Sequence, residues 1–179
     1  MHFADFLERI ESRRLREVAA HWNSARAGRR MPGWSHIDPL AIARQLPIVW
    51  AWKYDRPADR FTGRLAGEEI NEAFGRSLRG ADMAEFFRDA GFEAIFARHR
   101  RVVCEPCIAH GRGQVFSHAR RVGFGERIIL PLAEDGEAGD GILGATVYSI
   151  SPPAGMAGPR GGGEIVTFHP LGPVDVPVR

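Results

Sequence analysis

The chain has 179 residues, with 44% hydrophobic and 26% charged side chains, a composition typical of one globular domain with appendages. No run approaches the ~18 consecutive apolar residues that a membrane-spanning helix needs, and the first residues lack the apolar core of a secretion signal. The formal net charge is only +2, and acidic residues interleave with the arginines, so a nucleic-acid-binding surface is not expected. Only two cysteines occur, which excludes a disulfide framework and favours a cytoplasmic protein.

Residues 3–22 are predicted to form an amphipathic helix, because apolar residues recur there at spacings of three and four. The apolar positions change phase between Ile10 and Leu15, so the apolar stripe drifts around the helix. Such a helix either packs on its own domain or lies against a partner, and the sequence leaves both alternatives open. A connector containing Gly and Pro, residues 24–35, follows it.

The next segments predict a hairpin and then several short helices. Asp38 is expected to cap a short helix with Pro39 at its first position. Residues 46–55 are rich in aromatic and β-branched residues, and after a turn residues 60–67 return as a second strand, which predicts a hairpin. The expected helices are residues 68–74, 83–88 and 91–103.

Three further strands are predicted at residues 107–119, 124–133 and 141–150, the last two joined by a turn rich in Gly and Asp. The order of elements favours an α+β fold, with a five-stranded antiparallel sheet and helices on one face. We therefore divide the chain into an N-terminal helix and connector (1–30), a compact domain (31–150) and a tail (151–179). The tail is rich in Gly and Pro and is expected to be flexible, apart from one short apolar run, EIVTFHP.

Several motifs follow one another along the chain: HWNSARAGRRMP, IDP at 37–39, LPIVWAW, FTGRLAGEEINEAFGRSLRG, and ERIILPLAEDG with GILGATVY. In this order they resemble the single-PAS-domain family that is common in alphaproteobacteria. The resemblance covers roughly residues 21–150. It departs from the family at Glu68 and Ser77, where the family often has threonine and aspartate, and at Pro106, which lies between two cysteines here. It implies the PAS fold, a curved antiparallel sheet in strand order 2-1-5-4-3 whose helices enclose a pocket on the inner face.

The resemblance also implies a sensory function in signal transduction. In such modules a small ligand or a partner shifts the packing between helices and sheet, and an attached helix or a second protein responds to that shift. Only residues 151–179 follow the last expected strand, so we expect the output to act in trans, through protein–protein contacts. The expected partners are a signalling protein and a second copy of the chain, which would form a homodimer through the N-terminal helix.

Aromatic and apolar side chains are expected to surround the inner face of the sheet and to form the ligand pocket. The predicted pocket residues are Trp50, Trp52, Phe61, Phe74, Leu78, Phe86, Phe87, Phe96, His99, Ile129 and Leu143. One alternative is that they fill a solid core, and that the domain serves only for dimerisation or interaction. Some PAS modules hold haem through a histidine in this helix, so haem bound by His99 is a further alternative to a core histidine.

Cys104 and Cys107 form a C-x-x-C pair with His110 three residues further on. A structural zinc site needs a fourth ligand, and a thioredoxin-like pair would open a helix, whereas this pair lies where a helix is expected to end. We therefore predict no metal site here. The sequence also lacks a phosphate-binding loop, a nucleophile elbow and a calcium loop, so no catalytic residues are assigned and an enzyme is not expected.

Overall fold

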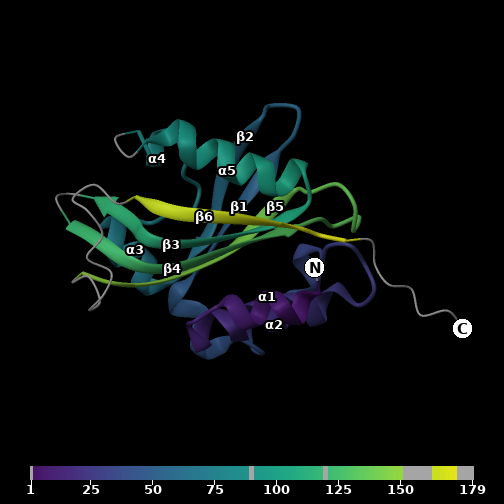
Figure 1. The fold of residues 1–179 in the computed structure, drawn as a ribbon. Helices are drawn as coiled ribbons and strands as arrows, with labels where there is room; N and C mark the ends of the chain where they lie inside the picture. Colours follow the sequence, from purple (N-terminus) through teal and green to yellow (C-terminus); the bar gives the residue numbers. More distant parts are fainter. Residues whose placement is uncertain (1, 89–90, 119–120, 151–162, 173–179) are drawn as a thin grey trace, which may run out of the picture.

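The computed structural model describes residues 2–88, 91–118, 121–150 and 163–172. Its centre is an antiparallel sheet of six strands in the order β2-β1-β5-β4-β3-β6. The strands are β1 (Val49–Asp55), β2 (Arg60–Ala66), β3 (Cys107–His118), β4 (Arg121–Leu132), β5 (Gly141–Ser149) and β6 (Glu164–Pro170). Figure 1 shows helices above and below this sheet.

The α+β class and the strand order implied by the family resemblance are confirmed, but the sheet has six strands where five were expected. The sixth, β6, is the apolar run EIVTFHP, which runs antiparallel to β3 from Cys107↔Pro170 to Gly113↔Glu164. Part of the tail therefore belongs to the sheet. The remaining tail residues, 151–162 and 173–179, lie outside the described part of the chain.

The single helix expected over residues 3–22 is two helices, α1 (Phe3–Arg9) and α2 (Arg13–Arg26). The change of phase between Ile10 and Leu15 marks the break. Ser12 begins α2, and its hydroxyl accepts a hydrogen bond from the amide of Leu15 at 3.5 Å. With two helices in place of one, each can turn its apolar side toward the same surface.

That surface is the outer face of the protein's own sheet. Phe6, Leu15 and Trp22 are fully buried there, in one cluster with the β4 residues Ile128 and Leu130. Of the two alternatives for the N-terminal helices, the structure therefore shows packing on the chain's own domain. It also means that helices cover both faces of the sheet, and not one face as expected (Figure 1).

The inner face carries the short helices α3 (Glu68–Phe74), α4 (Met83–Phe86) and α5 (Phe92–Cys104). Side chains alternate along β1: Trp50 and Trp52 lie on this inner face, while Val49 and Ala51 lie on the outer one. The sheet thus separates two apolar clusters, and the predicted pocket aromatics belong to the inner cluster.

The segment before β1 differs from the prediction. The short helix expected from Asp38 is a series of turns followed by a 3₁₀ helix over Ala43–Ile48, so the strand begins at Val49 and not at Leu46. Pro47 lies inside that 3₁₀ helix and has no amide hydrogen to give to a strand ladder, which explains the later start.

Among the described helices, none combines the length and the hydropathy required to cross a lipid bilayer.

Candidate ligand-binding cavity

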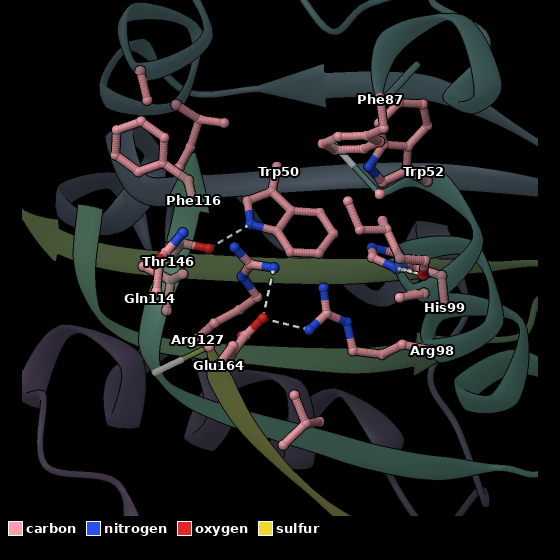
Figure 2. Close-up of a pocket in the computed structure, with 18 of the residues that line it drawn as sticks. Trp50, Trp52, Phe87, Arg98, His99, Gln114, Phe116, Arg127, Thr146 and Glu164 are labelled. Carbon is pink, nitrogen blue, oxygen red and sulfur yellow. Dashed lines mark hydrogen bonds and ion pairs between the residues drawn. The ribbon is translucent and has the colours of Figure 1, made fainter. Parts of the chain in front are cut away.

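A cavity of about 670 Å³ lies between the inner face of the sheet and α5. Its volume falls within the range of roughly 300–1,000 Å³ that is usual for small-molecule sites. Most of its lining is apolar or aromatic, and Figure 2 shows aromatic rings on one side of a small group of charged side chains. An enclosure of this kind can hold an organic molecule that has an apolar body and a polar group.

The structure places the sequence-predicted pocket residues in three positions. Those that line the cavity are Trp50, Trp52, Phe74, Leu78, Phe87 and His99. Those that belong to the same inner cluster without lining the cavity are Phe61, Phe86, Phe96 and Ile129. Phe86 supports the wall from behind, since its ring lies 5.8 Å from Trp52 and 5.1 Å from Phe74 between centroids.

Leu143 lies on the opposite face of the sheet, in the cluster beneath the N-terminal helices. Its neighbour Ile142 pairs with Trp52 across the ladder and shares the inner face with it. Because side chains alternate along a strand, a choice that is wrong by one residue places the side chain on the wrong face.

Trp50 is held in place by two residues of β5. Its indole N–H donates a hydrogen bond to the hydroxyl of Thr146 at 2.9 Å, and both groups are buried. Gly144 pairs with Trp50, and a methyl group added at this glycine would lie 2.2 Å from the indole ring. The absence of a side chain at residue 144 therefore allows the indole to lie close to the sheet and leaves space above it.

Three charged side chains meet at the edge of the cavity, and the sequence analysis identified none of them (Figure 2). Arg98 comes from α5, Arg127 from β4 and Glu164 from β6. One oxygen of the Glu164 carboxylate accepts a hydrogen bond from Arg98 and another, of 3.5 Å, from Arg127. All three side chains are nearly buried, at 11–12% exposed.

The charges in this group do not balance. Two guanidinium groups share one carboxylate, which leaves a surplus positive charge in an apolar enclosure. Burial lowers the pKa of Arg127 to about 10; the Glu164 carboxylate counteracts this shift and the Arg98 charge adds to it. An arginine pKa of this size still leaves the group charged at neutral pH, so the site is cationic.

His99 is a neutral core histidine. Its Nδ1 lies 2.6 Å from the carbonyl oxygen of Ile95, which can only accept, so Nδ1 carries the proton. Burial lowers its pKa well below the usual value, and the Arg98 charge lowers it further. The rings of Trp50 and Phe61 lie against it, with centroids at 5.5 and 6.0 Å, and the residue is only 2% exposed. His99 also lines the cavity, and with Nδ1 bonded to Ile95 only Nε2 remains to meet a ligand such as a haem iron.

The cysteine pair has the properties of ordinary packing. Burial raises the pKa of the Cys107 thiol to about 11, which opposes the thiolate that metal binding and redox exchange require. The imidazole of His110 lies on the outer face and bonds to Glu126. Among the described residues, no group of three or more His, Cys, Asp or Glu side chains could hold a metal ion.

Comparison with protein families supplies the identification. The family model described as PAS domain matches residues 10–147, more than half of the chain. The chain belongs to the PAS domain family. Comparisons with curated proteins and with solved structures gave no significant match. The family assignment makes a sensory or regulatory module the general function of this PAS domain.

The outer face of the PAS domain carries a second polar group, which joins the sheet to the N-terminal helices. The carboxylate of Glu126 accepts hydrogen bonds from the backbone amides of Glu11 and Ser12, at 2.9 and 2.7 Å, in the linker between α1 and α2. It also lies 2.8 Å from the imidazole of His110. Burial opposes ionisation of Glu126, but these hydrogen bonds outweigh it and lower its pKa.

Proposed function

We propose that this PAS domain is a non-enzymatic sensor, which binds a small molecule in the inner cavity and signals to a partner protein in trans. The observation that carries the proposal is the cavity itself, because it combines aromatic walls with buried charged groups. A core that served only for stability would gain by filling this volume with apolar side chains.

The arrangement of β4 supports a route from the cavity to the N-terminal helices. Glu126 and Arg127 are consecutive residues of this strand, so their side chains lie on opposite faces. Arg127 lines the cavity, whereas Glu126 holds the linker between α1 and α2. A ligand that displaces β4 at Arg127 would therefore disturb the linker directly.

The partner in this proposal meets the exposed side of α1 and α2. Their apolar side is buried against the sheet, so a homodimer through these helices would have to use their polar side. The functional unit also extends beyond residues 31–150, because α1 and α2 cover the outer face and β6 supplies Glu164 to the cavity.

The tryptophans provide a direct test of ligand binding. Trp50 and Trp52 line the cavity, whereas the indole N–H groups of Trp22 and Trp34 bond to Pro131 and Asp140 elsewhere in the protein. Titration with indole, a neutral apolar probe, should shift the ¹⁵N–¹H indole resonances of Trp50 and Trp52 and leave the other two in place. Native mass spectrometry of the purified protein should show an added mass that is lost on denaturation.

The competing function is a ligand-free module for dimerisation or interaction. A protein without added mass, whose four indole resonances do not respond to indole at millimolar concentration, would favour that function and refute the sensor.

A further inference from the structure

The charged group in the cavity has unused hydrogen-bonding capacity. A guanidinium has five N–H donors. Arg98 and Arg127 both approach the same oxygen of Glu164, Oε2. Among the described residues, Nε of each arginine and Oε1 of Glu164 are buried and have no hydrogen-bond partner. Buried charged groups are costly when they are incompletely paired; the two Nε–H donors need an acceptor, and two guanidinium groups on one carboxylate leave a surplus positive charge, so this group favours an anionic ligand.

The position of the Glu164 side chain shows that these arginines accept a carboxylate. Its carboxylate lies over Gly111 of β3, where a methyl group would be 2.1 Å from Oε1. Gly111 pairs with Arg127 across the ladder, and its lack of a side chain leaves the space in which the Glu164 carboxylate reaches the arginine pair.

We infer that the ligand of the cavity is a small organic carboxylate with an aromatic or branched apolar body, whose carboxylate binds Arg98 and Arg127 in competition with Glu164. This inference rests on the proposed function and adds the chemical class of the ligand. The apolar body lies against Trp50, Trp52 and Phe74, and the ligand carboxylate competes with Glu164 for N–H donors of Arg98 and Arg127, so that two carboxylates share two guanidinium groups.

Because the ligand competes with Glu164, its binding affects how β6, the edge strand of the sheet, is attached. Glu164 is the first residue of β6, and its ion pairs with Arg98 and Arg127 join that end of the strand to α5 and β4. The next residue, Ile165, is 75% exposed, so it contributes little to holding the strand there. A bound carboxylate therefore weakens the attachment of β6 at this end.

A matched pair of ligands tests the inference. Indole-3-acetate and its neutral analogue indole-3-acetamide have the same aromatic body and are titrated into the full-length protein by calorimetry. The acid should bind about tenfold to a hundredfold more tightly than the amide, the range expected for a hydrogen-bonded charge pair. Arg127→Gln and Arg98→Gln should each abolish most of this preference. Arg100→Gln, a control on α5 whose side chain pairs with Asp59 outside the cavity, should retain it.

Glu164→Gln should strengthen binding of the acid, whereas the arginine variants should weaken it, because Glu164→Gln removes the competing carboxylate. The acid should bind this variant more tightly than the wild type, by about tenfold, while the affinity for the amide stays the same. Each variant is first checked by circular dichroism, and the two separate arginine variants allow for one that fails to fold.

The outcomes separate this inference from the proposed function. Equal affinity for acid and amide, or a preference that survives in both arginine variants, would overturn the carboxylate assignment while the shifts of Trp50 and Trp52 still demonstrated a binding cavity. Tighter binding of phenyl phosphate than of phenylacetate would replace carboxylate by phosphate and also overturn it. Absence of any response of these two tryptophans to indole would refute the proposed function itself.

Discussion

Trp22 provides the sharpest test of how the N-terminal helices are held. Its side chain is fully buried between α2 and the sheet, and its indole N–H donates a hydrogen bond to the carbonyl oxygen of Pro131 at 2.9 Å. Trp22→Ala removes the largest side chain of this cluster and leaves that carbonyl without its donor. Substitutions of this kind cost about 3–5 kcal/mol in the free energy of unfolding.

The expected loss is measurable as a change in the melting temperature. For a chain of this length each kcal/mol lowers the melting temperature by about 2–4 °C, so Trp22→Ala should lower it by roughly 6–20 °C. The assay is thermal and urea unfolding, followed by circular dichroism. Arg16→Ala is the matched control: it lies on the exposed side of the same helix, and such surface changes are usually within about 0.5 kcal/mol.

This reasoning treats α1, α2 and the sheet as one cooperative unit. If Trp22→Ala unfolds at the same midpoint as Arg16→Ala, or if it shows a separate early transition with the main one unchanged, the helices are a detachable element. In that case the burial of Trp22 does not contribute to the stability of the PAS domain.

Three further predictions concern single contacts. Hydrogen bonds lower the pKa of Glu126 below its ordinary value of 4.5, so its stabilising contribution is present above that value and is lost as the pH falls through the lower folded pKa. The protection factors of the Glu11 and Ser12 amides, which compare their exchange rates with the intrinsic rates at the same pH, should therefore fall in acid, and Glu126→Gln should lower them already at neutral pH; equal protection in both proteins would contradict this. With a thiol reagent at pH 7.5 the half-buried Cys104 should react well before the buried Cys107, whose pKa is raised to about 11 by burial, and equal rates would refute this order. Gly144→Ala should displace the Trp50 indole and destabilise the protein by about 1–3 kcal/mol in urea unfolding, whereas an unchanged midpoint would mean that the ring can move freely.

The central sheet could be predicted because its strands have a simple pattern. Residues 46–55, 124–133 and 141–150 are rich in apolar residues, and the family resemblance supplied the order of the five expected strands. The β6 strand was predicted only as an apolar run in a flexible tail. Its seven residues follow a Gly- and Pro-rich segment, and its pairing with β3 is a long-range contact that leaves no local signal.

That helices cover both faces of the sheet could not be predicted, for a different reason. An amphipathic pattern shows that one side of a helix is buried, but it does not identify the surface that buries it. The outer face of the sheet offered a clue, since Val49 and Ala51 alternate with Trp50 and Trp52 and are also apolar. A strand that is apolar on both faces requires a cover on both, and the N-terminal helices provide the second one.

Some features of the cavity could be predicted from the sequence and others could not. Its aromatic wall follows from hydrophobic periodicity, and one charged residue was also accessible to the same reasoning. Arg127 has the same strand parity as Ile129, so alternation places a cation on the inner face among apolar residues. Nothing comparable identifies Glu164, because its carboxylate reaches the arginine only over Gly111 and only when β6 pairs with β3. The apolar character of the cavity is thus encoded locally, whereas its charge depends on a contact between distant segments. If the inferred exchange between ligand and Glu164 is correct, that distant contact is the one that decides which molecules the sensor accepts.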